Sequence, residues 1–288
     1  MPRKYTAVRK NLGNCMEKEC IAHAPRIKSR ITKYIHTFYS RDEEMNAAVR
    51  LKEEHTKRVA KVILTLADDL GLDKKNSDLA EIIACLHDIG RFKQFARYKT
   101  FVDRASENHA LLGVDEIRKN DLLKGLPLQA ANLVVNAVSC HNRAQIPDNT
   151  NKERLLFVKL IRDADKIDIL KVVTDYYAGN NTVRSRALEL DLPDTAEISP
   201  DIYDDVIHGR IGRVEKMRSL SDFKVLQMGW VFDINFPGSF RIIKRRKYLE
   251  KIHASLPKSS RADTVYTITN AHLERKCGND RPTDPLRQ

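Results

Sequence analysis

The chain has 288 residues, of which 42% are hydrophobic, and its formal net charge at neutral pH is +12. This length fits one large domain, or a domain with an additional region, and there are enough apolar side chains for a sizeable core. No uninterrupted apolar run of about 18 residues predicts a membrane span, and Met1–Tyr5 lacks an apolar signal region. The scattered cysteines form no CxxC pair, so we expect free thiols, a reducing compartment and a cytoplasmic location.

The basic excess favours anionic ligands such as nucleotides, nucleic acid or phosphorylated metabolites. A positive balance that mainly supports solubility is the simpler interpretation, and composition alone does not separate the two.

Helical patterns dominate the first two thirds of the chain. Residues 15–39 predict a helix that is interrupted near Pro25. The segment Ser40–Glu43 has the form of a capping box with Ser40 as the N-cap. The helix that it starts is predicted to run to Leu70, where Gly71 ends it.

One side of this helix is predicted to face the core. Its apolar residues recur at spacings of three or four, which gives a single buried stripe of Val59, Ile63, Leu66 and Leu70. Since His55 lies four residues before Val59, it belongs to the same stripe and faces inward.

The second helix of this region carries the dipeptide His87-Asp88 near its end. We expect Ser77 to cap it and Gly90 to stop it. A loop is predicted from Arg91 to Arg104, where aromatic rings alternate with cations. Such a loop stacks a base and holds phosphates, or it anchors itself to the core through the rings.

Two further helices each place a histidine. Ser106 is predicted to cap the third helix, which puts His109 in its first turn. Pro127 fits the first turn of the fourth helix, on which His141 shares a face with apolar residues.

The fifth helix is predicted over about 153–177 and contains two candidate aspartates. Asp165 is four residues from both Ile161 and Ile169, so we place it on the buried side. Asp163 is predicted to face outward.

The last third has a weaker pattern, with a polar connection over 180–200 and a basic amphipathic helix over Phe240–Ile252. The predicted fold class is all-α, with a helical core and an additional, mostly helical C-terminal part. The predicted parts are an N-terminal helical extension (1–39), the metal-binding core (40–178), an accessory region packed on the core (179–275) and a disordered tail (276–288).

Six side chains on these helices have the composition of a divalent metal site. Burying ionisable groups without partners is costly, and a shared metal ion satisfies several of them at once. Imidazole nitrogen with carboxylate oxygen suits Mn, Fe, Ni, Co or Zn, and Mg less well. Taken singly, each residue has a simpler explanation as a hydrogen-bonded core histidine or a capping aspartate, but their combination favours metal. The six candidate ligands are His55, His87, Asp88, His109, His141 and Asp165.

Their order along the chain resembles the HD superfamily of metal-dependent phosphohydrolases. The resemblance covers about residues 50–175, and the run from His87 to Arg91 (HDIGR) is similar to the family's usual HDIGK. It implies an HD-domain helical core and a metal-activated water that attacks phosphorus.

The resemblance also implies which residues hold which ion. The first ion would be bound by His55, His87, Asp88 and Asp165, and Asp88 would bridge to a second ion at His109 and His141. These two extra histidines resemble the dinuclear branch of the superfamily. Cleavage of a cyclic dinucleotide by an HD-GYP enzyme is disfavoured, since Asn142 follows His141 and the chain has no Gly-Tyr-Pro.

Several cations near the six ligands are candidates for holding the substrate. Asp88 and Arg91 are the predicted catalytic residues, and a solvated surface cation is the alternative explanation for each basic residue. Phosphate contacts are predicted for Arg91, Arg58, Arg143 and Lys166.

The sequence thus predicts a metal-dependent phosphohydrolase that cleaves a phosphoester or phosphoanhydride, of a nucleotide or another small phosphorylated molecule, with one or two divalent ions. The alternatives are a phosphodiesterase on a cyclic or linear dinucleotide and a non-catalytic, metal-stabilised nucleotide-binding protein. A nuclease is less favoured and rests on the basic run Lys244–Lys247.

Overall fold

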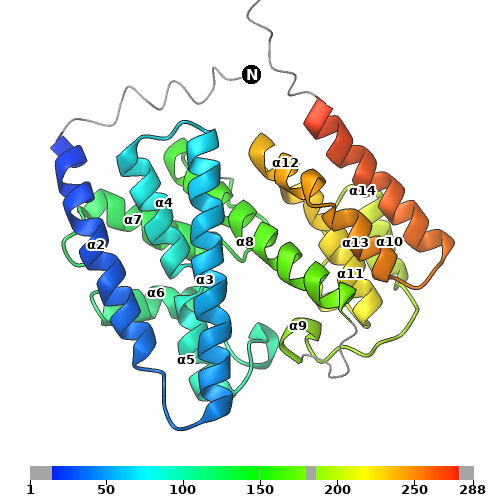
Figure 1. Ribbon diagram of the computed structural model, residues 1–288, viewed down its shortest axis with the longest axis horizontal. Helices are drawn as coiled ribbons and strands as arrows, with labels where there is room; N and C mark the ends of the chain where they lie inside the picture. Colours follow the sequence, from blue (N-terminus) through cyan, green and yellow to red (C-terminus); the bar gives the residue numbers. More distant parts are fainter. Residues whose placement is uncertain (1–14, 149, 180–185, 279–288) are drawn as a thin grey trace, which may run out of the picture. The chain divides into compact units, whose positions relative to one another are not determined.

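The computed structural model describes residues 15–148, 150–179 and 186–278, and every regular element in these ranges is a helix (Figure 1). The all-α prediction is therefore confirmed. None of the described helices combines the length and the apolar character that a membrane span requires.

The chain divides into two compact units, and the division falls after Asp165 inside the long helix α8 (Lys152–Ala178). The other elements of the first unit are α2 (Cys15–His36), α3 (Glu43–Asp69), α4 (Lys74–Leu86), α5 (Ile89–Tyr98), η2 (Asp103–Ala105), α6 (His109–Lys119) and α7 (Leu128–Cys140).

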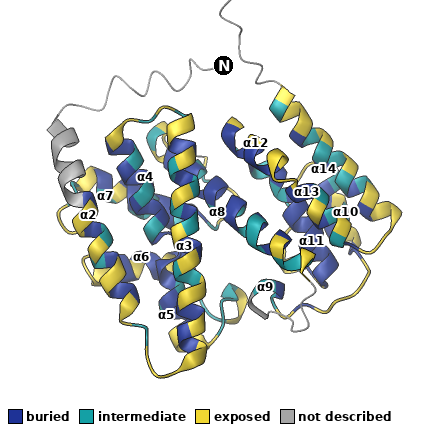
Figure 2. Cartoon of the chain, viewed as in Figure 1, coloured by how far each residue is buried: buried dark blue, intermediate teal, exposed yellow. Residues whose placement is uncertain are grey.

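The first unit is built around α3 and α4, which pack side by side (Figure 1). Helix α4 also contacts α2 and α7, and α6 contacts α5 and α7. Of the apolar stripe predicted on α3, Val59, Ile63 and Leu66 are buried, whereas Leu70 just after the helix is half-buried. Figure 2 shows that α3 has both buried and exposed residues along its length. Gly71 follows the end of α3 with φ of 62°, a left-handed conformation typical of a helix C-terminus.

Helices α3, α4 and α6 begin at acidic or amide caps close to the predicted serines, which corrects the sequence interpretation. In each helix the side-chain oxygen of the cap accepts a hydrogen bond from a backbone N–H of the first turn. Because Asp, Asn and Ser cap helices almost equally well, neighbouring candidates are hard to separate by pattern. The caps are Asp42 instead of Ser40, Asp73 instead of Ser77, and Asn108 instead of Ser106.

The segment after His87 departs most from the prediction. Gly90 does not stop a helix but lies within α5, and much of the expected loop over 91–104 is helical. A Cβ atom on Gly90 would overlap the His109 carbonyl oxygen and lie 2.5 Å from the Gly113 nitrogen. Gly90 therefore allows the backbones of α5 and α6 to touch, which holds His109 near the end of α4.

In the second unit, α14 (Ser260–Gly278) contacts four other helices (Figure 1). These are α10 (Pro200–Ile207), α11 (Leu220–Gly229), α12 (Pro237–Arg245) and α13 (Tyr248–Ser255). Shorter elements are α9 (Arg186–Glu189), η3 (Val214–Lys216) and η4 (Trp230–Asp233).

Three further sequence predictions can be compared with the observed helices. The single basic helix over 240–252 is instead the pair α12 and α13, separated by Lys247 in a left-handed conformation. Helix α2 continues through Pro25 without the expected interruption. In the predicted tail, 276–278 belong to α14 and the rest lies outside the described residues, as do 180–185 of the predicted connection.

Candidate metal centre

The six predicted ligands lie in, or next to, six helices. His55 lies within α3 and Asp165 within α8. The other four lie at helix ends, where the chain changes direction: His87 at the end of α4, Asp88 just before α5, His109 at the start of α6 and His141 at the end of α7.

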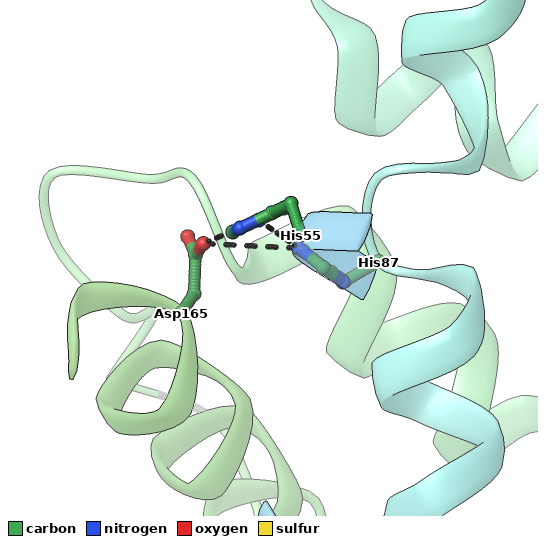
Figure 3. Close-up of side chains that lie close together, drawn as sticks. All are labelled: His55, His87 and Asp165. Atoms are coloured by element: carbon green, nitrogen blue, oxygen red, sulfur yellow. Dashed lines mark hydrogen bonds and ion pairs between the residues drawn. The ribbon is translucent and has the colours of Figure 1, made fainter. Parts of the chain in front are cut away.

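His55, His87 and Asp165 form the first group of donor atoms (Figure 3). The Nε2 atoms of His55 and His87 are 3.2 Å apart. Asp165 Oδ1 lies 3.1 Å from His55 Nε2 and 3.7 Å from His87 Nε2. Both histidines are buried, and three donor atoms from distant parts of the sequence face one small volume.

Asp88, His109 and His141 form the second group. The Nε2 atoms of its two histidines are 3.0 Å apart. Asp88 Oδ1 lies 3.3 Å from His109 Nε2 and 3.8 Å from His141 Nε2. All three residues are buried.

Asp88 faces both groups, with one oxygen toward each. Its Oδ1 belongs to the second group, whereas its Oδ2 lies 3.6 Å from His55 Nε2 and 3.8 Å from His87 Nε2. This is the arrangement of a carboxylate placed to bridge two ions.

Two of the histidines are oriented by the backbone of their own helices. His87 Nδ1 donates to the Ala84 carbonyl, and His141 Nδ1 donates to the Val138 carbonyl, each at 2.7 Å. A carbonyl only accepts, so the proton of each neutral ring is on Nδ1 and the lone pair is on Nε2. Burial lowers the pKa of His87 to about 4, which keeps that ring neutral near pH 7.

His109 is oriented by a side chain, Asp103, which the sequence interpretation missed. The Asp103 carboxylate oxygens lie 2.9 Å and 2.7 Å from His109 Nδ1 and accept a hydrogen bond from its N–H, which leaves the lone pair on Nε2. Burial and the nearby Arg91 guanidinium lower the pKa of His109 to about 3. Burial alone would raise the pKa of Asp103, but the hydrogen bond from His109 and the charge of Arg91 lower it well below its usual range.

The carboxylates of the two groups are held in their charged form. Burial alone would raise the pKa of Asp88, yet the net pKa is well below its usual range because Lys52 and His87 stabilise the anion. The pKa of Asp165 is lowered in the same way, mainly by the hydrogen bond from His55.

These protonation states leave lone pairs facing one another in the second group. The Nε2 atoms of His109 and His141 are so close that their lone pairs repel each other unless a positive charge lies between them. Asp88 Oδ1 adds a negatively charged oxygen beside them. A divalent cation relieves this repulsion and suits a set of imidazole and carboxylate donors. The donor set therefore fits a metal ion on its own chemistry.

The family model of the HD domain matches residues 53–170, the region that contains all six donors. This region is an HD domain. HD domains bind divalent metals and are generally metal-dependent hydrolases. No curated protein and no solved structure matches the chain.

Arg91, a predicted phosphate contact, lies beside one of the ligands of the HD domain. Its Nε is 3.5 Å from Asp88 Oδ1. Its Nη1 donates to Asp103 at 2.7 Å, to the Phe101 carbonyl at 2.5 Å and to Gln94 at 2.8 Å. Arg91 thus holds the carboxylate that orients His109.

The other predicted cations are placed differently. Lys166 Nζ forms an ion pair of 2.6 Å with Asp233 in the second unit. Arg58 is half-buried on α3, and Arg143 is exposed just after α7.

One local prediction near the HD-domain site was wrong. Asp163 was expected to face outward, but its side chain is fully buried. The prediction assumed that α8 has one buried side, but α8 is buried on more than one side. In the aromatic segment, Phe92 and Phe95 are buried as core residues. They anchor α5 to the core, which was the simpler of the two interpretations.

Proposed function

We propose that this HD domain hydrolyses a phosphoester or phosphoanhydride bond, with a nucleotide as its substrate class and two divalent ions held by the two donor groups. The observation that carries the proposal is the placement of Asp88, whose Oδ2 faces His55 and His87 while its Oδ1 faces His109 and His141. One carboxylate between two imidazole pairs is an arrangement that can hold two neighbouring ions, as a two-metal hydrolase does.

Each group would hold one ion through neutral imidazoles and an anionic oxygen. His55, His87 and Asp165, with Asp88 Oδ2, would hold the first, and His109 and His141, with Asp88 Oδ1, the second. Divalent ions bound there supply a more acidic water as nucleophile and polarise a phosphoryl oxygen. The chain's own contribution is to keep the rings of His87 and His109 neutral and to direct their Nε2 lone pairs toward the other donors.

The charges around the two groups favour a phosphorylated substrate. Asp88, Asp103, Asp165, Lys52 and Arg91 together carry one net negative charge. Two divalent ions would change this to three positive charges. A phosphate monoester dianion and one hydroxide carry three negative charges, so the loaded site would be neutral with that substrate. The basic excess of the whole chain supports the same class of ligand.

A hydrolysis screen tests the proposal. The wild-type protein, analysed for bound metals as purified, is assayed with Mn, Co, Ni, Fe, Zn and Mg against nucleotides, dinucleotides and phosphorylated metabolites. We expect metal-dependent release of phosphate or of a nucleoside monophosphate. Asp88→Asn should reduce turnover to the background rate because both groups lose the shared anion.

Asp68→Asn, which makes the same change on an exposed position of α3, is the matched control and should keep full activity. Ligand binding without turnover under every metal would contradict hydrolysis and identify a non-catalytic nucleotide-binding protein. Turnover of dinucleotides alone would identify the phosphodiesterase alternative.

A further inference from the structure

Lys52 is a cation at the centre of the site that the sequence interpretation did not single out. It lies on α3 three residues before His55, so the two side chains project from neighbouring positions on one face of the helix. Its Nζ donates to Asp88 Oδ2 at 2.8 Å. Only 18% of its side chain is exposed.

The position of Lys52 relative to the first group follows from this contact. Asp88 Oδ2 is the oxygen that faces His55 and His87, so the ammonium group lies at the edge of that group. The Phe101 ring lies beneath it, with the ring centroid 5.2 Å from Nζ. A partly buried ammonium group beside an aromatic face has fewer water neighbours, and an anion that reaches it binds more strongly than it would in water.

The ammonium group also has donors to spare. A lysine carries three N–H donors, and among the residues described here Asp88 is the one hydrogen-bond partner of Lys52. Arg91 differs, because its Nη1 already contacts three acceptors. Lys166 is paired with Asp233. The described hydrogen bonds thus leave Lys52 with N–H donors that can bind further oxygen atoms.

We propose that Lys52 binds a non-bridging oxygen of the substrate phosphoryl group and selects terminal phosphate over phosphodiester. This inference rests on the proposed function of the site. A monoester dianion presents three non-bridging oxygens and two negative charges, whereas a diester presents two oxygens and one charge. A third cation beside two metal ions therefore gains more from the monoester.

Inorganic phosphate is the direct probe, because it has the charge of the terminal group and needs no turnover. Its affinity is measured by calorimetry on metal-loaded protein for wild type, Lys52→Met and Lys52→Arg. The methionine keeps the apolar stem and removes the charge. We expect Lys52→Met to weaken phosphate binding by about ten- to a hundredfold, the usual value of a hydrogen bond to a charged group. Lys52→Arg should restore most of the affinity.

Lys57→Met is the matched control, since Lys57 lies on the same helix but is exposed and paired with Glu53 and Glu54. It should leave phosphate affinity unchanged. Elemental analysis should give the same metal content for all variants, and circular dichroism checks that each is folded.

The ester preference gives a second readout. With p-nitrophenyl phosphate and bis(p-nitrophenyl) phosphate, Lys52→Met should lower kcat/KM for the monoester by at least tenfold more than for the diester. Unchanged phosphate affinity, or equal losses on both esters, would overturn the inference while leaving the proposed function intact. Loss of bound metal in Lys52→Met would also overturn it, since Lys52 would then organise the ligands. If the wild type hydrolyses neither these esters nor any compound of the hydrolysis screen, the proposed function fails, and the phosphate titration still decides the role of Lys52.

Discussion

The two donor groups share Asp88, but different parts of the chain hold them in place. In the first group, His87 is oriented by the backbone carbonyl of Ala84, which belongs to α4 itself. In the second group, His109 is oriented by the side chain of Asp103, and Arg91 and Gln94 hold that carboxylate in turn.

This difference decides how each group responds to mutation. A backbone carbonyl stays in place as long as its helix is folded. The orientation of His87 through this hydrogen bond therefore does not depend on the side chain of a residue that is not a ligand. The orientation of His109 depends on a network of side chains from α5 and η2. We therefore expect single substitutions outside the ligands to weaken the second group selectively, and a change in helix packing to weaken both.

Gly90→Ala should have the largest effect and should remove the difference between the groups. The added methyl group would overlap the His109 carbonyl oxygen, which is backbone and cannot rotate away. Overpacking of this kind costs about 1–3 kcal/mol and sometimes more. Because Asp88 precedes α5 and His109 begins α6, separating these helices disturbs both groups. Urea unfolding should show the lower stability, and metal analysis should show loss at both sites.

Gly278→Ala serves as the control, since a Cβ atom there meets no neighbouring atom within 4 Å among the described residues. It should leave stability nearly unchanged. Wild-type stability in Gly90→Ala would mean that α5 and α6 separate freely, and the close packing would then not be what holds His109.

Gly90 also shows where sequence reasoning about the fold succeeded and where it failed. Apolar periodicity predicted the long helices that carry His55 and Asp165, because a stripe over many turns is a strong signal. Apolar periodicity did not predict α5, because a glycine after a helical run is compatible both with the end of a helix and with a close contact between two helix backbones. Only the position of α6 in space decides between them.

The candidate site divides in a similar way. His87 and Asp88 were found because histidine and aspartate in a set pattern along the chain have few other uses. Asp103 and Lys52 were missed because each is an ordinary charged residue in sequence and acquires its role through one contact, with His109 or with Asp88. A lone aspartate six residues before a candidate ligand histidine is a weak signal that now has a physical meaning.

Asp103→Asn should weaken the second group and spare the first, which sharpens the comparison. The amide keeps the shape of the side chain but removes the negative charge that strengthens the hydrogen bond from His109 Nδ1. Loss of such an outer partner typically lowers metal affinity about 10–100-fold. Calorimetric titration of metal-free protein should show one step weakened and the other unchanged.

Asp115→Asn, an exposed position on α6, is the matched control for this change and should leave both steps alone. If Asp103→Asn weakened both metal-binding steps equally, the two groups would be coupled through Asp88, and the effect of Asp103 would not be confined to the second group. An unchanged titration would mean that Asp103 does not support metal binding by the second group.

Arg91→Lys should have the smallest effect, and it separates two roles for this residue. Lysine keeps the charge but lacks the planar fork, so it cannot reproduce the three contacts that Arg91 Nη1 makes with Asp103, Gln94 and the Phe101 carbonyl. If Arg91 acts through Asp103, affinity at the second group falls by less than about tenfold, and inorganic phosphate binds the loaded protein as in wild type. Arg97→Lys, an exposed cation on the same helix paired with Glu107, should change neither quantity. Weaker phosphate binding with unchanged metal affinity would instead place Arg91 on the substrate, as the sequence predicts.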